Sequence, residues 1–393
     1  MPDPASSEPR ASSRHYDCDV AVVGAGPAGC AAALALAGRG VRVVILEKAA
    51  LPRHKTCGGG VLRRALDRLP VDANAAIERE CRAAELVHHA PALRFVCERT
   101  QPVVSMVMRA HFDQLLATAA QRAGAELVTD APLTGLVHEH DAVRLTTATA
   151  GVRARFVIAA DGAASTVARL TGRPELGNVV PALECEVTLE PEAMKPFAAT
   201  ARFDFGVVPA GYAWVFPKRD HLSIGVLTTR KGAAHLPECY RRYLALLGIG
   251  RIVREERHGY VIPCQPRRQA FDVPRVLFAG DAAGLADPIL CEGISAGILS
   301  GQLAARAIVD GGFDDSAARR GYRTALEDGW LGEMRVARRL AWVLYRCPRV
   351  RGALLARSGR RASEFFMRLV CGETSYRAGL RRPGSFFALL RRG

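Results

Sequence analysis

The stretch DCDVAVVGAGPAGCAAALALAGRGVRVVILEK, residues 17–48, decides the fold class of this chain. The apolar run 20–23 predicts a buried strand, the glycine-rich residues after it predict a tight turn into an Ala/Leu-rich helix, and 41–46 predict a second strand. This order of strand, turn, helix and strand is typical of a βαβ unit that binds a dinucleotide. The sequence therefore predicts an α/β protein organised around a parallel sheet.

The turn carries the residues that would receive a pyrophosphate. Gly24 permits the tight turn, Gly26 lets the backbone approach a phosphate, and Gly29 allows the helix to pack closely on the strand. The free N–H groups at the start of the helix favour negative charge. At the end of the second strand, Glu47 can accept hydrogen bonds from an adenosine ribose, and its charge disfavours a 2′-phosphate. The predicted cofactor-binding residues of this unit are Gly24, Gly26, Pro27, Ala28, Gly29, Glu47 and Lys48.

Length and composition are those of a globular protein. The chain has 393 residues, 49% hydrophobic and 24% charged, which is enough for two or three domains that share a large core. It has no run of about 20 uninterrupted apolar residues, as a membrane span would need. Residues 1–16 are polar and rich in Ser and Pro, which predicts a disordered leader. The 11 cysteines are scattered and never spaced C-x-x-C, which argues against a disulfide scaffold or zinc site and favours the cytoplasm.

The net charge of +15 is concentrated near the C-terminus. Residues 319–393 hold 18 Arg, no Lys and 5 acidic residues, so that this segment alone carries 18 − 5 = +13. The pattern predicts helices broken at Pro348 and Pro383, with Arg and apolar residues interleaved as in interfacial helices. Such a region suits the anionic inner face of a membrane, which would make the protein peripheral, and a solvated basic face is an equal alternative. The segment has no recognition module, which argues against nucleic acid as a partner.

A second candidate site lies in the loop that follows the first unit. It ends in Cys57-Gly58-Gly59-Gly60, where three glycines beside a cysteine permit a close approach to a flat ligand. The basic residues 53–55 favour a reactive thiolate, and a buried structural cysteine is the alternative. A helix is predicted to follow over 61–69.

The middle of the chain predicts strands and one long helix. Strands are expected over 85–108, a helix over 110–122, and further strands over 126–129, 133–139, 142–149 and 152–160. Residues 183–230 alternate as in an antiparallel sheet and carry Tyr212, Trp214 and Phe216, which could line a substrate pocket or be ordinary core aromatics. His138 and His140 alternate on one strand with no third ligand nearby, so no metal site is predicted.

Near the end of the predicted sheet, Gly280 and Asp281 form a second polar turn. Asp281 could bind the hydroxyls of a cofactor that extends beyond its ADP half. A small-residue helix is predicted over 295–308, and its positive N-terminal end, at Gly293 and Ile294, would face that ligand.

Three separated motifs together resemble the FAD-dependent oxidoreductases built like p-hydroxybenzoate hydroxylase. They are Gly24–Glu47, the stretch ADGAASTV at 160–167, and Gly280-Asp281. The resemblance implies that FAD is the cofactor, that Asp281 holds its ribityl chain, and that Arg109 contacts it. It also implies that Asp161 and Gly162 lie near the cofactor and are linked to the use of a pyridine nucleotide. The sequence departs from the pattern at Ala168, where an Arg is frequent.

Two further stretches, KTCGGG at 55–60 and PAGYAWVFPK at 209–218, resemble the geranylgeranyl reductase family. The resemblance implies that Cys57, Gly58 and Gly59 lie by the flavin ring and take part in catalysis, with Gly60 binding the cofactor. It implies that Tyr212, Trp214 and Phe216 line an apolar tunnel for an isoprenoid chain. Cys291 stands where the family usually has Gly, which places a second thiol by the flavin at the substrate site.

The predicted architecture follows. A Rossmann-like FAD-binding domain of three-layer ββα architecture comprises 17–84, 107–180 and 265–318. An antiparallel-sheet substrate domain comprises 85–106 and 181–264, and a basic helical region comprises 319–393.

The predicted activity is FAD-dependent reduction of isolated C=C bonds in a prenyl chain, such as that of a geranylgeranyl lipid, a chlorophyll or a quinone. NAD(P)H or a small electron carrier would be the reductant. One alternative is a flavin monooxygenase that hydroxylates an aromatic small molecule or protein side chain. A halogenase is disfavoured because Tyr212 replaces the first Trp of its paired motif, and a non-catalytic membrane-tethered flavoprotein is the alternative from another class.

Overall fold

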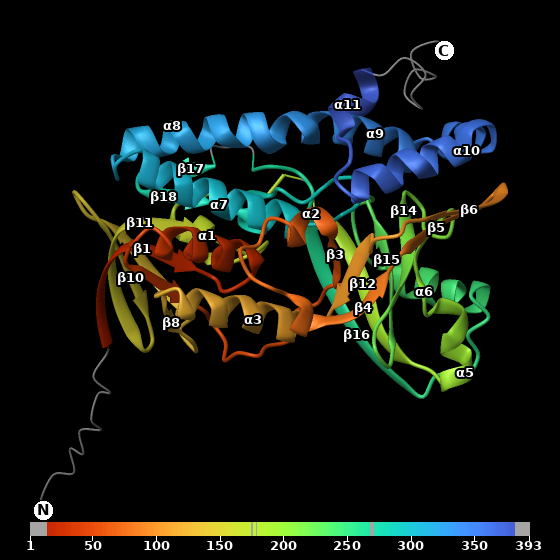
Figure 1. Ribbon diagram of the computed structural model, residues 1–393, viewed down its shortest axis with the longest axis horizontal. Coiled ribbons are helices and arrows are strands. Elements are labelled where there is room, and N and C mark those ends of the chain that lie inside the picture. The colour runs from red at the N-terminus through yellow and green to blue at the C-terminus, as the bar shows by residue number, and fades with distance from the viewer. Residues whose placement is uncertain (1–13, 174–175, 178, 268–270, 382–393) are drawn as a thin grey trace, which may run out of the picture.

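The computed structural model describes residues 14–173, 176–177, 179–267 and 271–381, which form an eight-stranded, a seven-stranded and a three-stranded sheet with a layer of helices. In Figure 1 the eight-stranded sheet lies on the left, the seven-stranded sheet on the right, and the C-terminal helices run along the top of both. The predicted α/β fold class is confirmed.

The eight-stranded sheet is built on the predicted βαβ unit. Its strands run in the order β17-β18-β11-β1-β2-β8, and the antiparallel strands β10 and β9 continue from β11. Val20–Val23 are all buried and pair in parallel with Val43–Leu46 on one side and with 156–159 on the other. Burial on both faces explains the unbroken apolar runs in the sequence. The bounds are β1 Arg14–Val23, β2 Val43–Leu46, β8 Glu126–Val128, β9 Leu133–His138, β10 Val143–Thr147, β11 Ala150–Ala159, β17 Asp272–Val273 and β18 Val276–Phe278.

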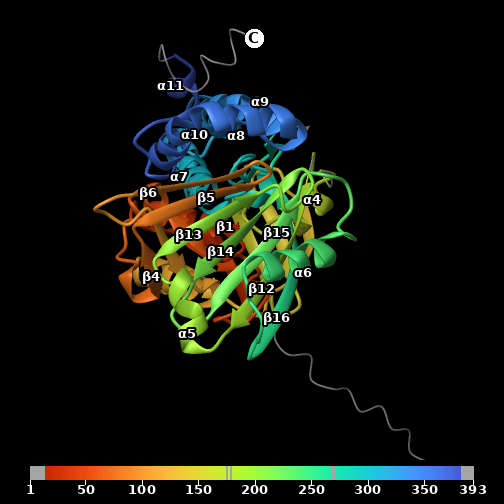
Figure 2. The ribbon, with the colours of Figure 1, turned by 90° about the vertical axis from the view of Figure 1, so that its right-hand side faces the viewer.

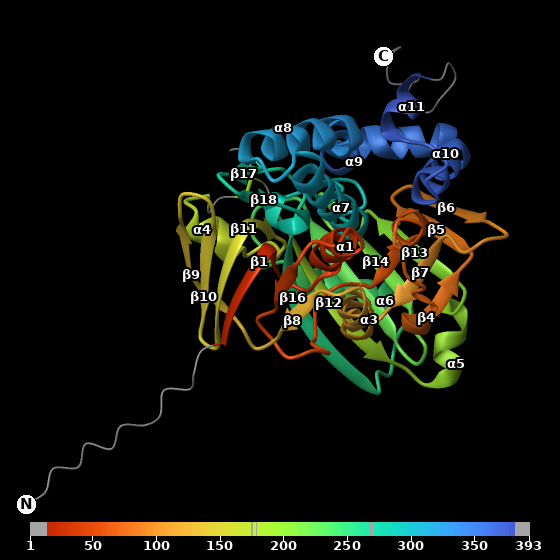
Figure 3. The ribbon, with the colours of Figure 1, turned by 60° about the vertical axis from the view of Figure 1, so that its left-hand side comes forward.

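Helices α1 (Pro27–Ala37), α3 (Arg109–Arg122) and α7 (Ile294–Asp310) cover one face of this sheet (Figure 3). α1 packs between the other two and contacts α7 very closely. A Cβ on Gly301 of α7 would lie 2.1 Å from the carbonyl oxygen of Ala28, so only glycine fits there. This contact fixes the N-terminal end of α7 beside the glycine-rich turn.

The seven-stranded sheet runs in the order β16-β12-β15-β14-β13-β5-β6. The prediction of a purely antiparallel sheet is wrong at one place, because β13 pairs with β5 in parallel. Figure 2 shows helix α6 lying across the outer face, where Tyr240 and Tyr243 are fully buried. The other face is therefore free to line a cavity. The bounds are β5 Ala83–His89, β6 Ala92–Glu98, β12 Val179–Thr188, β13 Thr200–Phe205, β14 Gly211–Pro217, β15 Leu222–Thr228, β16 Arg254–Pro263, α5 Pro191–Met194 and α6 Leu236–Leu246.

A small sheet of β3 (Gly60–Leu62), β7 (Val104–Val107) and β4 (Ile77–Cys81) connects the two larger ones. It corrects the predicted helix over 61–69. Residues 60–62 pair with 104–106 instead, and only the short α2, Arg63–Leu66, follows. It also divides the predicted segment 85–106 between two sheets. The remaining short elements are α4 Thr166–Leu170 and the 3₁₀ turns Asn74–Ala76, Lys195–Phe197 and Gly280–Ala283.

The C-terminal region is helical, as predicted, although it begins at Asp315 rather than at 319. Asp314 caps the first helix, since its carboxylate accepts a hydrogen bond from the Ala317 N–H at 2.8 Å. Pro348 and Pro383 are the predicted breaks between helices. Pro348 is the first residue of α10, which agrees with the prediction, and Pro383 lies outside the described residues. No helix in the described part of the chain is both long and apolar enough to cross a membrane. The bounds are α8 Asp315–Leu326, a π-helix Glu327–Leu331, α9 Gly332–Arg346, α10 Pro348–Val370 and α11 Tyr376–Arg381.

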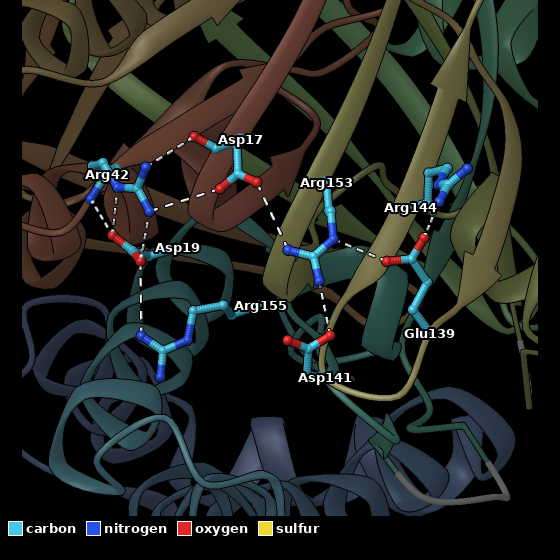
Figure 4. Close-up of polar contacts among 8 residues, drawn as sticks. All are labelled: Asp17, Asp19, Arg42, Glu139, Asp141, Arg144, Arg153 and Arg155. Atoms are coloured by element: carbon cyan, nitrogen blue, oxygen red, sulfur yellow. Dashed lines mark hydrogen bonds and ion pairs between the residues drawn. The ribbon is translucent and has the colours of Figure 1, made fainter.

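Ion pairs surround the end of the parallel sheet that lies away from the glycine-rich turn (Figure 4). Arg153 contacts Glu139 at 3.0 Å and Asp141 at 2.8 Å, and Arg42 contacts Asp19 at 3.2 Å. Close to this end the structure corrects the predicted leader. Residues 14–16 belong to β1 and pair with 150–152, whereas 1–13 are not among the described residues.

Candidate active site

The glycine-rich turn has the predicted geometry. Gly24 adopts φ +104°, and a Cβ on it would lie 2.4 Å from the carbonyl oxygen of Ala160. A Cβ on Gly29 would lie 1.9 Å from the carbonyl oxygen of Gly24, so the predicted close packing of α1 on the turn is present. Together these contacts bring the ends of β1 and β11 to the N-terminus of α1.

Gly26 differs from both, because a Cβ there would meet no atom closer than 3.9 Å. The nearest atoms are Nη2 of Arg109 at 3.9 Å and Nη2 of Arg53 at 4.0 Å. Buried Asp113 holds both guanidinium groups, accepting from Arg109 at 2.8 and 2.9 Å and from Arg53 at 3.0 Å. The space at Gly26 is thus open and faced by two guanidinium groups and the N-terminus of α1, which fits a pyrophosphate.

Glu47 lies beside this space. Its carboxylate accepts a hydrogen bond from the Ala25 N–H at 2.8 Å and forms an ion pair with Arg53 at 3.1 Å. Although burial lowers it, the pKa of Arg109 is raised by the carboxylate of Asp113, so this guanidinium stays charged. Sequence reasoning missed Arg53 and Asp113 as parts of the cofactor site, because 60 residues separate the two.

A cavity of about 410 Å³ extends from this turn between the two large sheets. All the predicted site residues except Gly29 line it, and Gly29 instead supports the turn from behind. The lining residues among them are Gly24, Gly26, Pro27, Ala28, Glu47, Lys48, Cys57, Gly58, Gly59, Gly60, Arg109, Asp161, Gly162, Tyr212, Trp214, Phe216, Gly280, Asp281, Cys291, Gly293 and Ile294. Segments far apart in the sequence therefore form one site.

The residues expected to bind the rest of the cofactor lie on two polar turns. These are Asp161-Gly162, which follows β11, and Gly280-Asp281, which follows β18. A Cβ on Gly293, just before α7, would lie 2.7 Å from Oδ1 of Asp281, so the glycine allows the helix end to approach that carboxylate. Burial raises the pKa of Asp281, and the charges of Lys55 and Arg109 oppose the shift. Asp161 is half-buried, and its Oδ1, which solvent does not reach, has no hydrogen-bond partner within the described chain. Half-buried carboxyl groups that face the cavity fit the hydroxyls of an extended cofactor.

The Cys57 loop is held in place by a lysine. Lys218 is fully buried, and its Nζ donates to the carbonyl oxygens of Gly58 at 2.7 Å and Val107 at 2.9 Å. The Sγ of Cys57 accepts from the Gly59 N–H at 3.3 Å. Burial lowers the pKa of Lys218. Lys218 was missed as a functional residue, although it lies in the PAGYAWVFPK stretch.

The basic neighbours of Cys57 contact other groups. Arg53 pairs with Glu47 and Asp113, and the ring of His54 packs at a tilt against that of His258 with centroids 4.2 Å apart. The Nζ of Lys55 lies 3.3 Å from the centroid of the Tyr260 ring, and burial lowers its pKa to about 8. Arg53 and His54 are therefore occupied by other partners, whereas the neighbouring Cys57 still acts on Lys55 and raises the pKa of that lysine against the effect of burial.

Three aromatic residues of β14 form a wall of the cavity next to the loop. A Cβ on Gly58 would lie 2.9 Å from Nε1 of Trp214 and 3.0 Å from Phe216, so the loop rests directly on these rings. Tyr212 donates a hydrogen bond to the Leu290 carbonyl at 2.6 Å, which fixes the wall to the segment that carries Cys291. Cys291 itself has φ +52°. The predicted aromatic residues are thus brought to the cysteine loop.

The face of the seven-stranded sheet that lines the cavity also carries a polar group that was not predicted from the sequence. Glu184 of β12 lines the cavity, and Ser223 donates a hydrogen bond to it at 2.8 Å. The signal available in the sequence was two carboxylates at alternate positions, Glu184 and Glu186, in an otherwise apolar strand. No group of three His, Cys, Asp or Glu side chains among residues 14–173, 176–177, 179–267 and 271–381 is placed to hold a metal ion.

Comparison with known proteins gives the family. A family model described as an FAD binding domain matches residues 17–308. The chain is 30% identical over 379 residues to the chloroplastic geranylgeranyl diphosphate reductase of Arabidopsis thaliana, which covers 89% of this chain and 79% of that protein. It is 31% identical over 346 residues to digeranylgeranylglycerophospholipid reductase 1 of Methanopyrus kandleri, covering 81% and 87%.

A solved structure has the same fold. It is a geranylgeranyl bacteriochlorophyll reductase-like protein from Thermoplasma acidophilum, with a TM-score of 0.74 and 22% identity over 96% of this chain and 99% of that one. With the glycine-rich turn, the two polar turns and the cysteine loop around one cavity, these matches show that the chain belongs to the geranylgeranyl reductase family of FAD-dependent oxidoreductases.

Proposed function

We propose that this protein reduces isolated C=C bonds in a prenyl chain. The observation that carries the proposal is the single cavity in which a cofactor turn, a cysteine loop and an aromatic wall meet. Bound FAD would supply a hydride, after reduction by NAD(P)H or a small electron carrier. The chain's own residues would bind the cofactor through Gly26, Arg109 and Asp281, and exclude water with the aromatic wall.

A second cavity supports a long apolar substrate. It has a volume of about 110 Å³, lies under α9 and α10, and is lined almost entirely by apolar side chains. Aromatic rings separate it from the main cavity, with the Phe203 and Phe366 centroids 5.7 Å apart. An isoprenoid chain that reaches from the reacting carbons toward α10 would find apolar surface along this line.

The test measures hydride transfer from the reduced protein to a geranylgeranyl substrate in the absence of oxygen. The reductase predicts that the reduced protein is reoxidised by the alkene with oxygen absent. A monooxygenase would be reoxidised only when oxygen is admitted, and its product would contain a new hydroxyl group. Binding of FAD with neither reaction would indicate the non-catalytic alternative.

We propose for Cys57 a role in placing the proton at the reacting carbon. Cys57→Ser should leave FAD content and reduction by the donor nearly unchanged and should slow transfer to the alkene by roughly 10- to 1000-fold. The matched control is Cys97→Ser, in β6 and away from the cavity lining. If Cys57→Ser keeps the wild-type rate, the reductase proposal stands and this role fails.

We further propose that α9 and α10 dock on an anionic membrane surface. Trp342 is 63% exposed and Val350 44% exposed; the exposed Arg339 and Arg346 lie about one turn before and after Trp342 on α9, and the exposed Arg349 adjoins Val350 on α10. Exposed apolar side chains among arginines are the combination that binds anionic interfaces. Wild type should bind vesicles that contain anionic lipid, be released by salt, and ignore neutral vesicles. Trp342→Ala should weaken vesicle binding. If this variant binds as strongly as wild type, the face around Trp342 is not the docking surface.

A further inference from the structure

The carboxyl group of Glu184 is buried at the cavity and only half satisfied. The residue is 2% exposed and lines the main cavity. Its Oε1 accepts a hydrogen bond from Ser223 Oγ at 2.8 Å, whereas Oε2 has no partner in the part of the chain that the structure describes. An unpartnered buried carboxyl oxygen is costly unless it interacts with something that enters the cavity.

The register of the seven-stranded sheet places Glu184 on the same face as the aromatic residues of β14. Trp214, Gly225, Glu184 and His258 are successive partners across β14, β15, β12 and β16, so their Cα positions share one face. Gly225 makes room for the indole, because a Cβ there would lie 2.0 Å from Cζ2 of Trp214. Trp214 Nε1 in turn donates to Ser223 Oγ at 3.4 Å, which links the wall to the hydroxyl that contacts Glu184.

A chain of titratable groups leads from Glu184 toward the surface. Glu186, two residues further along β12, pairs with His221 Nε2, and His221 Nδ1 contacts Asp220 at 2.7 Å. The Asp220 side chain is 83% exposed, so this chain reaches solvent. Glu186 and Glu184 occupy alternate positions on one face of β12, so this chain brings exchangeable groups from solvent to the neighbour of Glu184 on that face, with no hydrogen bond between the two carboxyl groups among the described residues.

The charges around Glu184 favour its protonated form. Burial and then the charge of Glu186 raise its pKa to about 8, against the opposing effects of Ser223, Lys218 and His221. His258 of β16 is the other titratable neighbour across the strand pair. At neutral pH Glu184 is thus a buried acid that holds its proton.

We propose that Glu184 is the source of the proton that the alkene takes up, which leaves Cys57 to position the reacting carbon for that proton and not to donate it; this role rests on the function proposed above. Reduction breaks the C=C π bond and forms two C–H bonds. One carbon takes the hydride that the cofactor supplies, and the π electrons form the second C–H bond with the proton of the Glu184 O–H. The O–H electron pair stays on the carboxylate, which Ser223 stabilises, and a solvent proton arriving through His221 and Glu186 restores the acid.

The first test does not depend on turnover. In the FAD-loaded full-length protein, the infrared C=O band of a protonated carboxyl should titrate away with a midpoint near 8. Glu184→Gln should remove that band. Glu255→Gln should keep it, because Glu255 pairs with Val187 in register and so lies on the other face of the sheet. Ser223→Ala should move the midpoint upward, since the hydroxyl lowers the pKa of Glu184.

The second test measures transfer to a geranylgeranyl alkene under anaerobic conditions. Glu184→Gln should lower the transfer rate by roughly 100- to 10,000-fold with FAD content and donor-driven reduction unchanged, while Glu255→Gln keeps the wild-type rate. The wild-type rate should fall as the pH rises through about 8. Absence of the band, or a wild-type rate in Glu184→Gln, overturns the role of Glu184 and leaves the reductase standing. A wild type that never transfers to the alkene overturns both.

Discussion

On the cofactor side of the cavity, glycines let the backbone pack closely and the buried carboxylates of Glu47 and Asp113 are paired with arginines, whereas the seven-stranded sheet buries Glu184 with one carboxyl oxygen unpartnered among the described residues. At Gly24, Gly29 and Gly293 a Cβ would lie 2.4, 1.9 and 2.7 Å from protein oxygen atoms, so close backbone packing creates the binding surface. On the side formed by the seven-stranded sheet, Glu184 and Lys218 are 2% and 0% exposed. Lys218 anchors the Cys57 loop through the Gly58 carbonyl, and Glu184 accepts a hydrogen bond from Ser223.

This difference indicates that the glycine-rich turns bind the cofactor, whereas the buried titratable side chains of the seven-stranded sheet are suited to proton transfer. A surface made by glycines can hold a large cofactor through backbone N–H groups, which do not titrate. Buried acids and amines have shifted pKa values and can exchange protons, but their burial costs stability. We therefore expect substitutions on the two sides to fail in different ways.

The largest effect is expected at Gly29. Gly29→Ala places a Cβ 1.9 Å from the Gly24 carbonyl, so α1 must move away from β1. We expect a loss of about 3 kcal/mol or more in the free energy of unfolding, already in the FAD-free protein. Urea unfolding of the FAD-free variant measures this.

Gly26→Ala is the matched control, because its Cβ would meet no protein atom within 3.9 Å. This variant should unfold like wild type, and its FAD affinity should fall by about 10- to 100-fold, or about 1.4–2.8 kcal/mol. If instead it unfolds early and binds FAD normally, Gly26 does not face the cofactor.

The next effect is the pH dependence contributed by Glu184. Its pKa is raised from 4.5 to about 8, so between these values the folded chain holds a proton that the unfolded chain releases. Stability from this group is fully present below the unfolded pKa and is lost as pH rises through the folded one. The free energy of unfolding of Glu184→Gln minus that of wild type should therefore grow by about 1.4 kcal/mol per pH unit and level off above about 8. A difference that is constant with pH would show that Glu184 is ionised throughout.

A smaller effect is expected at Lys218. Lys218→Met leaves the buried carbonyl oxygens of Gly58 and Val107 without their donor, which should cost about 1–3 kcal/mol in unfolding free energy and loosen the cysteine loop. Lys195→Met is the control, since the Lys195 side chain is exposed and its partner in the described part of the chain is the equally exposed Glu192. Equal unfolding midpoints for the two variants would contradict the anchoring role.

The two sides also differ in how much of them could be predicted from sequence. Gly24, Gly26, Glu47 and the Cys57 loop each lie in one contiguous stretch, whose local conformation fixes where its groups point. The separate Gly280-Asp281 turn was predicted for the same reason, since it ends a strand of the same sheet. All of these residues line the cavity.

The sheet side depends on contacts between strands. Glu184, Ser223 and Trp214 meet only because β12, β15 and β14 pair in one register, which local sequence does not determine. The predicted helix over 61–69 failed for a related reason. Residues 60–62 have no strong local preference, and pairing with Val104–Met106 makes them a strand.

The smallest effect is expected for the ion pairs at the far end of the parallel sheet (Figure 4). The Arg153 side chain is 43% exposed and contacts Glu139 at 3.0 Å, Asp141 at 2.8 Å and Asp17 at 3.7 Å. Solvent and salt screen such charges, so many contacts do not imply much stability. Arg153→Gln should leave the thermal unfolding midpoint unchanged at moderate ionic strength and lower it slightly at low ionic strength. A large, salt-independent fall would mean that charges here act like the buried ones at Glu184, and the distinction between exposed and buried polar groups would fail for this protein.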